Sequence, residues 1–481
     1  MVGTAASFAE HHGLWSDDQA RLAREIEGRA ASGEFDVLRL SFADQHGLLR
    51  GKTLIAGDGL RLGNGCTLTT TLLLKDTSHR TIYPVWQAGD QLAGGRMTGG
   101  GDFVLIPDPS TFRLLPWADG NGWVLCDIYY TDGTPVPFST RQILRKQMAR
   151  LEDRGQRLVT GLEVEFHVFH QLEPALAPQD ATHPGAVPEV ELVAQGYQYL
   201  TETRYDEVEE IMDLLRQNIE GIGLPLRSME VEFGPSQFEF TFHAGDALES
   251  ADNMVLFRSA VKQVCQRHGL HATFMCRPHL PNVFSSGWHL HQSVQDVKSG
   301  TNIFVGQDGD LLSADARHYV GGLLKHARAA SLFTTPTING YKRYRPRTLA
   351  PDRAVWGRDN RGSMVRVCGQ PGDAATRIEN RIGEPAANPY LYAASQIICG
   401  LDGIDNTVDP GPPADDPYDA EAEALPASLM EAVSALRGSD LFAAEMGAEF
   451  VDYMCTLKEA EISRFLTETT DWEMREYFQI Y

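Results

Sequence analysis

The stretch GLEVEFHVF at residues 161–169 has the composition of a buried β-strand but carries two acidic residues. Glu163 and Glu165 alternate with Val164 and Phe166, so the two carboxylates point to one face, about 7 Å apart along the chain. Two like charges among apolar neighbours are costly unless a positive charge lies between them. The stretch therefore predicts a strand that presents its acids to a cation.

Three further strand candidates repeat this pattern: EVEFGPSQFEF at 230–240, SSGWHLHQS at 285–293 and ATRIENRIGEP at 375–385. In the same order, their polar residues are Glu232 and Glu239, then His289 and His291, then Arg377, Glu379 and Arg381. Taken singly, paired polar residues on a strand are most often a solvated face. Four such strands in one chain favour a shared polar site.

This set of side chains has the chemistry of a divalent-metal site. Its five carboxylates and its imidazoles are mainly hard oxygen ligands, which favour Mg²⁺ or Mn²⁺ over Zn²⁺. Five acids exceed the need of one divalent ion, so we expect two to three ions per site. Arginine binds phosphoryl oxygens bidentately, so the residues predict a magnesium cluster that serves phosphoryl transfer.

The sequence carries neither of the two familiar ATP-binding loops. It lacks a G-x-x-x-x-G-K-[ST] loop, and no kinase-type glycine loop precedes a suitable lysine. We therefore expect ATP to lie in a cavity formed by strands rather than at a helix N-terminus.

The overall composition argues against several classes of protein. The chain has 481 residues, enough for one large core or two to three domains. A formal net charge of −23 argues against a nucleic-acid partner, which would require a basic face. No apolar run approaches the ~18 residues that span a membrane, and the first residues lack the features of a secretion signal. Seven scattered cysteines without a C-x-x-C pair indicate reduced thiols, so we expect a cytoplasmic protein.

The order of helix and strand patterns predicts an α+β fold in two parts. A polar helix at 17–31 and a hairpin at 34–54 open a small β-rich domain over residues 15–115. A larger domain follows over residues 130–481 and ends in a helical tail from Leu425 onward.

Within the larger domain, Ser139 and Gln142 form a predicted capping box at the start of a helix. Amphipathic patterns predict two further helices, at 206–223 and 249–268. The strand candidates between the helices are 161–169, 229–242, 287–294 and 375–382. These elements predict a large sheet backed by helices.

Taken in order along nearly the whole chain, these motifs resemble the glutamine synthetase family. The similar elements are GLEVEF, the E-x-G-P-x-Q-x-E run at 232–239, SGWHLHQS, INGYKRYRP, WGRDNRGSMVR, and RIENR followed by PAANPYL. The N-terminal SFADQHGLLRGK and the PDPSTFRLLPW segment are similar to its small domain. The resemblance implies a small N-terminal β-grasp domain and a catalytic domain with a curved antiparallel sheet backed by helices.

The resemblance also implies a role for each matching residue. The metal nearer the acceptor site would be held by Glu165, Glu232 and Glu239, and the metal at the ATP phosphates by Glu163, His289 and Glu379. Nucleotide and phosphate contacts would come from His291, Ser293, Arg366 and Arg377. The glutamate carboxylate would be held by Arg343 and Arg381, and the transferred phosphoryl group would meet Arg361. Catalysis would thus depend on Arg361, Arg381 and Glu379.

In that family ATP phosphorylates the γ-carboxylate of L-glutamate, and a nitrogen nucleophile then displaces the phosphate. The metals neutralise crowded phosphate oxygens, and the arginines stabilise the charge that grows in the transition state. Family members also assemble as double rings, so the resemblance implies a homododecamer of two stacked hexameric rings. Each site would then lie between a small domain and a neighbouring catalytic domain.

The sequence departs from ammonia-using members where the nitrogen donor binds. Their Asp-Gly-Ser-Ser loop is absent, and the corresponding region reads LTTTLLLKDTSHRTIYPVW at 68–86. Leu349 stands where they carry a glutamate, and Phe284 and Ser285 replace part of a loop that borders the glutamate site. Losing both acids removes an anionic pocket for ammonium and leaves apolar surface for an amine that carries carbon. We therefore expect an organic monoamine as the donor.

Several alternatives stay open at this point. One alternative is a true glutamine synthetase, in which Asp76 or another acid would substitute for the lost acids. Another is a γ-glutamylpolyamine synthetase, which would also require acids at this site. An inactive scaffold relative is disfavoured because all six expected metal-ligand positions are filled. Trp288 and Trp356 are candidates, beside Phe284, for an apolar wall, and His79 or Asp76 for the base that takes the amine's proton.

Overall fold

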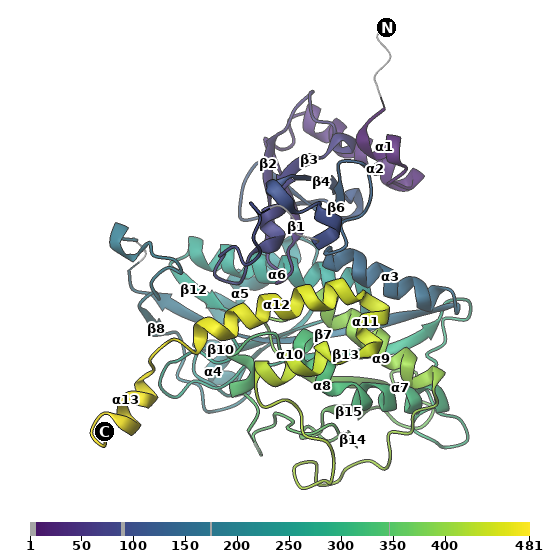
Figure 1. The fold of residues 1–481 in the computed structure, drawn as a ribbon, viewed down its shortest axis with the longest axis vertical. Coiled ribbons are helices and arrows are strands. Elements are labelled where there is room, and N and C mark those ends of the chain that lie inside the picture. Colours follow the sequence, from purple (N-terminus) through teal and green to yellow (C-terminus); the bar gives the residue numbers. More distant parts are fainter. Residues whose placement is uncertain (1–5, 88–91, 174–175, 346) are drawn as a thin grey trace.

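The computed structural model describes residues 6–87, 92–173, 176–345 and 347–481. A small N-terminal region, purple to dark blue in Figure 1, stands on a larger body that holds the remaining helices and strands. The arrangement is α+β, with one sheet in each part. The β-grasp identity of the small part stays a prediction, and residues 88–91 within it lie outside the described residues.

The sheet of the small part has the strand order β2-β1-β6-β4-β3, with β5 also paired to β6. The predicted hairpin is confirmed, because β1 and β2 pair antiparallel and bury Leu38, Leu40 and Phe42. The sheet extends past residue 115, where the sequence prediction ended this domain, because β6 lies between β1 and β4. The strands are β1 Val37–Ala43, β2 Leu49–Ile55, β3 Cys66–Thr69, β4 Asp102–Pro107, β5 Arg113–Leu114 and β6 Asn121–Tyr130.

The sheet of the large part has the strand order β14-β15-β16-β13-β7-β10-β9, and β8, β11 and β12 pair with β7. Its described strands pair antiparallel except for β14 with β15. The long β7 is the stretch in which the two glutamates alternate with apolar residues. The strands are β7 Gln156–Gln171, β8 Val190–Leu192, β9 Leu226–Val231, β10 Gln237–Phe242, β11 Gly245–Asp246, β12 Leu270–Thr273, β13 Trp288–Asp296, β14 Trp356–Arg358, β15 Val365–Cys368 and β16 Arg377–Gly383.

Helices precede the small sheet and pack against the large one. The predicted helix at 206–223 corresponds to α5, and a separate short helix, α4, precedes it and ends at Asp206. The predicted capping box of α3 is wrong, because the Ser139 side chain makes no cap hydrogen bond and Gln142 donates to the Ile128 carbonyl instead. The helices are α1 Phe8–His12, α2 Asp17–Ala31, α3 Thr140–Glu152, α4 Glu202–Asp206, α5 Glu209–Gly221, α6 Ala247–Arg267, α7 Ala314–Lys325, α8 Ala327–Thr334, α9 Pro389–Asp405, α10 Leu429–Arg437, α11 Asp440–Met446, α12 Ala448–Phe465 and α13 Asp471–Tyr477.

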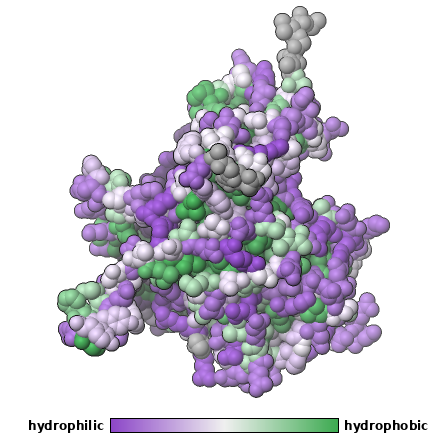
Figure 2. Space-filling view, in the orientation of Figure 1, coloured by the Kyte–Doolittle hydropathy of each residue, from purple (hydrophilic) through white to green (hydrophobic). Residues whose placement is uncertain are grey.

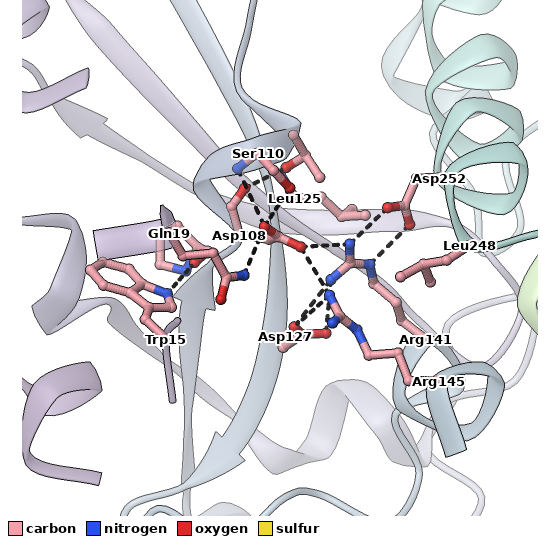
Figure 3. Close-up of polar contacts among 12 residues, drawn as sticks. Trp15, Gln19, Asp108, Ser110, Leu125, Asp127, Arg141, Arg145, Leu248 and Asp252 are labelled. Carbon is pink, nitrogen blue, oxygen red and sulfur yellow. Dashed lines mark hydrogen bonds and ion pairs between the residues drawn. The ribbon is translucent and has the colours of Figure 1, made fainter. Parts of the chain in front are cut away.

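A buried ion-pair network connects the small sheet to the helices of the large part (Figure 3). Arg141 on α3 donates to Asp108 at 2.8 Å, to Asp127 on β6 at 3.1 Å and to Asp252 on α6 at 2.7 Å. Arg145 adds a second contact to Asp108 at 2.9 Å. Each buried carboxylate has a cationic partner, so the network holds the two parts in one relative position.

The C-terminal segment makes a second connection and then leaves the body. Along α12, Tyr453 donates to the Leu73 carbonyl and Arg464 pairs with Asp76 at 2.9 Å, both in the small part. The last helix, α13, projects away from the body, and hydrophobic side chains gather on it (Figures 1 and 2). None of the described helices combines the length and the apolar character that crossing a bilayer requires.

Candidate active site

The register of the large sheet places the polar residues of five strands on one face. Glu163 on β7 lies opposite His289 on β13, and Glu165 lies opposite Glu239 on β10. Glu379 on β16 lies opposite both His291 on β13 and Arg366 on β15. Facing residues on adjacent strands point to the same side, so these side chains form one polar cluster. The residues that alternate with them are buried in the core on the other face.

Two histidines and one glutamate form the centre of this cluster. His289 Nδ1 lies 2.7 Å from one oxygen of Glu163, and His291 Nε2 lies 3.1 Å from the other. Arg343 donates to His289 Nε2 at 3.2 Å, so His289 carries its proton on Nδ1 and donates it to Glu163. Burial lowers the pKa of His289 to about 4, which leaves the imidazole neutral. Burial alone would raise the pKa of Glu163, but hydrogen bonds from the two histidines outweigh it and lower that pKa.

The remaining acids of the cluster repel one another. Burial and the charge of Glu232 raise the pKa of Glu165 to about 8. Burial and the charges of Glu163 and Glu165 raise the pKa of Glu239 to about 11. Glu163, Glu239 and His289 each offer a ligand atom, and these atoms lie within 4.8 Å of one another. A buried set of carboxylate oxygens with one neutral imidazole fits a divalent cation of the Mg²⁺ or Mn²⁺ type.

Arginines neutralise the acid at the β16 end of the cluster. Arg381 and Arg366 both donate to the fully buried Glu379, the latter at 3.0 Å. Burial alone would raise the pKa of Glu379, but the neighbouring His289, Arg381 and His291 lower it. Arg377 donates to His291 Nδ1 at 3.2 Å, so these guanidinium groups and the histidines share one polar network. Oxyanions such as phosphates suit this end of the site.

A cavity of about 1220 Å³ opens over the acid cluster. The predicted residues that line it are Glu163, Glu165, Glu232, Glu239, Phe284, Ser285, His289, Arg343, Leu349, Arg361, Arg366 and Arg381. Four predicted residues lie outside this lining: His291, Ser293, Arg377 and Glu379. His291 and Ser293 lie on β13, and Arg377 lies on β16. Glu379 is buried and paired with Arg366 and Arg381.

One aspect of the predicted donor site needs correction, and the roles of Asp76 and His79 stay predictions. Trp288 and Trp356 are buried, Trp288 against Tyr392 and Trp356 with its indole N–H bonded to a carbonyl, so neither extends an apolar wall of the cavity. Asp76 is buried and paired with Arg464, and it does not line the cavity of this chain. His79 lies three residues beyond it, exposed and also outside the lining.

Several residues that line the cavity were missed from the sequence. Tyr197, Phe233 and Arg277 contribute to the wall, and Glu230 lies beside the cluster on β9. Phe233 directly follows Glu232 in the E-x-G-P-x-Q-x-E run at 232–239, so its position in this motif could have indicated it. Tyr197 lies in an irregular segment without periodicity, so no local pattern indicates its place. Cys368 was also missed: it lies outside the cavity lining, and its thiol lies within 4.8 Å of ligand atoms of His291 and Glu379.

Known proteins resemble this chain over most of its length. The model of the family described as "Glutamine synthetase, catalytic domain" matches residues 137–477. A gamma-glutamylanilide synthase of an Acinetobacter species is 42% identical, over 98% of this chain and 99% of that protein. A gamma-glutamylethanolamide synthetase of Streptomyces coelicolor is 32% identical, over 95% of each chain. A solved GmaS/ADP complex aligns with a TM-score of 0.77 at 28% identity, over 96% of this chain and 100% of that one.

Proposed function

This chain belongs to the glutamine synthetase family, and we propose that it joins the γ-carboxylate of L-glutamate to an organic amine at the expense of ATP. It is an ATP-dependent carbon–nitrogen ligase, and its products would be a γ-glutamylamide, ADP and phosphate. One observation carries the proposal: a buried cluster of acids and a histidine lies in the same cavity as several arginines and the apolar side chains of Phe284 and Leu349.

The acid cluster is proposed to hold two to three Mg²⁺ or Mn²⁺ ions. Glu165, Glu232 and Glu239 would hold the ion nearer the acceptor. The ion at the ATP phosphates would be held by Glu163, His289 and Glu379. When bound, the ions would neutralise the phosphate oxygens, which lowers the cost of bringing a polyanion to a carboxylate. The neutral state of His289 and the mutual repulsion of the acids support this assignment.

The arginines are proposed to bind the anionic groups of the substrates. Arg343 and Arg381 would hold the carboxylate of glutamate, and Arg361 would contact the phosphoryl group as it transfers. A second set would face the nucleotide and its phosphates: His291, Ser293, Arg366 and Arg377. Guanidinium groups that are already oriented by the protein stabilise growing charge without reorganising. Arg343 is oriented in this way by the Arg381 carbonyl, 3.0 Å from its Nη1.

The donor is proposed to be a monoamine with an apolar body. Leu349 is 63% exposed and lines the cavity, in the position that ammonia-using members fill with glutamate. Each Å² of apolar surface that an amine buries there contributes about 25 cal/mol. Ammonia and polyamines instead require acids, and Asp76 is committed to Arg464 outside the cavity of this chain. Phe284 and Ser285 complete the proposed donor side of the site.

The assembly and location of the enzyme are also proposals. A small domain and a catalytic domain per chain, twelve chains in two stacked hexameric rings, would follow the family pattern. The seven cysteines form no disulfide and the reaction consumes ATP, which supports a cytoplasmic enzyme. Light scattering on the purified protein tests the assembly, and a mass far below that of twelve chains would contradict it.

An amine screen tests the proposed reaction. Purified enzyme is incubated with L-glutamate, ATP and MgCl₂, and phosphate release is followed with ammonia, an alkylamine, an arylamine or a diamine. We expect an organic monoamine to give the highest kcat/KM and mass spectrometry to identify its γ-glutamylamide. Equal or faster turnover with ammonia would identify an ordinary glutamine synthetase instead.

A further inference from the structure

Three aromatic rings form a cluster in the wall of the cavity. The ring centroids of Phe233 and Phe284 are 4.8 Å apart. The ring centroid of Tyr197 lies 5.5 Å from that of Phe233 and 5.8 Å from that of Phe284. All three pairs are close to perpendicular, the edge-to-face geometry that aromatic rings prefer. We call Tyr197, Phe233 and Phe284 the aromatic cluster.

The aromatic cluster adjoins the acids beside which the amine has to react. Phe233 follows Glu232 in the chain, and its backbone N–H donates to the Glu232 carboxylate at 3.0 Å. The rings are between 38% and 43% exposed, although the hydroxyl of Tyr197 is held by the Asn282 carbonyl at 2.9 Å. The cluster is therefore a preformed apolar surface that is open to a ligand, which reduces the entropy lost on binding.

Two residues of the cavity lining have an uncommon backbone conformation. Tyr197 has a φ of +60° and Leu349 a φ of +59°, in the left-handed region that costs most residues roughly 1–2 kcal/mol. Both side chains line the cavity. Strain of this kind persists where the surrounding structure enforces it, and such positions concentrate at binding sites. This observation is independent of the ring geometry.

Positive charge lies beside the aromatic cluster, because Arg277 donates at 2.9 Å to the hydroxyl of Ser285, which follows Phe284 in the chain. Arg277, Arg345 and Arg347 line the cavity, and Arg347 has a partner in Asp419 at 3.3 Å. The acids nearby are the proposed metal ligands and Glu230, which accepts a hydrogen bond from Ser228 at 3.0 Å. A protonated alkylamine would meet cations here. An aromatic amine is a far weaker base, because its nitrogen lone pair is delocalised into the ring, and it arrives uncharged at neutral pH.

From these contacts, and on the basis of the proposed function, we infer that the aromatic cluster binds the ring of a primary aromatic amine as the preferred nitrogen donor. The amine nitrogen attacks the γ-carbonyl carbon of γ-glutamyl phosphate and forms the C–N bond. The C–O bond to phosphate breaks, the phosphate leaves with the bonding electrons, and the nitrogen loses its proton to water. A neutral amine needs no acid to strip a proton before it attacks, consistent with leucine at position 349.

Competition between two amines of similar size tests this inference on the unmodified enzyme. Aniline and cyclohexylamine are supplied together at equal concentration with L-glutamate, ATP and Mg²⁺ at pH 7, and both amides are quantified by mass spectrometry. We expect the anilide to exceed the cyclohexylamide at least tenfold. The cyclohexylamide share should rise at pH 9, where more of that amine is uncharged.

Equal products at pH 7, or an excess of cyclohexylamide, would overturn the inference and leave the ligase proposal intact. Phosphate release with none of the amines, ammonia included, would overturn both.

Two variants test the aromatic cluster itself. Phe233→Leu and Phe284→Leu keep an apolar side chain but remove the ring, and each should lower kcat/KM for aniline at least fivefold relative to kcat/KM for ammonia. Most of the loss should lie in the KM for aniline, with the KM for ATP unchanged. Phe465→Leu is the matched control, because Phe465 is 40% exposed but lies outside the cavity lining. An unchanged aniline-to-ammonia ratio in both variants would refute the assignment, and the ratio is insensitive to partial loss of folded enzyme.

Discussion

Glu163 and His289 lie directly opposite each other on β7 and β13, with His289 Nδ1 2.7 Å from the Glu163 carboxylate. Arg343 on the other side of the ring fixes the tautomer by donating to Nε2. The contact therefore links an acid of the central strand to an arginine that faces the proposed glutamate site. We therefore expect a change at this pair to alter the proposed metal binding and the orientation of the substrate together.

Glu163→Gln should reduce kcat/KM by at least about 100-fold, because an amide is a poorer ligand for a hard cation than a carboxylate. The Mg²⁺ concentration for half-maximal activity should rise in the same variant, and a Mg²⁺ titration of phosphate release measures both effects. Glu191→Gln, an exposed glutamate on β8, is the control and should leave the titration unchanged. Treatment of the unmodified enzyme with EDTA should abolish turnover until Mg²⁺ is restored. An unaltered titration in Glu163→Gln would refute its role as a ligand.

Arg361→Ala should lower kcat about 1000-fold with only a few-fold change in the KM for ATP. An arginine that meets the transferred phosphoryl group stabilises charge that develops mainly in the transition state. Arg361→Lys should recover little of the loss, since a point charge does not reproduce the planar fork. Steady-state kinetics measure both parameters. The surface arginine Arg317, which pairs with Asp409, gives the control Arg317→Ala. A matching rise in KM without a loss of kcat would place Arg361 in ground-state binding instead.

Leu349→Glu should improve the use of ammonia and impair the use of apolar amines. The new carboxylate restores an anionic group where ammonia-using relatives carry one, and it removes apolar surface from the cavity wall. We expect kcat/KM for ammonia to rise several-fold and that for the preferred amine to fall at least tenfold. Leu172→Glu adds the same charge at an exposed site outside the cavity lining and should change neither value. Parallel changes for both donors would show that the position does not select the donor.

Asp108→Asn should destabilise the joint between the two sheets. Burial alone would raise the pKa of Asp108, but the charge of Arg141 and hydrogen bonds from Ser110, Arg141 and Gln19 hold it well below the ordinary value of 3.8. Removing one partner of a buried ion pair costs about 3 kcal/mol, the lower end of the usual range, because Asp127 and Asp252 still face Arg141. A lower thermal midpoint at pH 7 is the expected result.

The pH dependence of this effect has a defined sign. Because the folded-state pKa of Asp108 is lowered, its stabilisation is complete well above pH 3.8 and is lost as the pH falls below that value. The difference in midpoint between the unmodified protein and Asp108→Asn should therefore stay constant at pH values well above 3.8 and shrink as the pH falls below 3.8. Asp132→Asn breaks an exposed pair with Arg96 and is the control, with a small effect at every pH. A difference that grows on acidification would contradict the assignment.

The faces of individual strands could be predicted without tertiary information. Alternation is a local property of an extended chain, so GLEVEFHVF by itself places Glu163 and Glu165 on one side and Val164 and Phe166 on the other. The same rule predicts that His289 and His291 share one face of β13, and that Arg377, Glu379 and Arg381 share one face of β16. Residue chemistry adds the preference for a hard divalent cation. The helices α2, α5 and α6 could likewise be predicted from the local period of their apolar residues.

Tertiary contacts decided the rest, because they join residues that are far apart in the chain. No local pattern indicates that Glu239 faces Glu165, or that Phe233, Phe284 and Tyr197 meet. Asp76 resembles a free acid in the sequence, whereas in the fold it is buried and paired with Arg464 of α12. Local periodicity determines which way a side chain points, whereas burial and pairing depend on the global packing that determines what it faces.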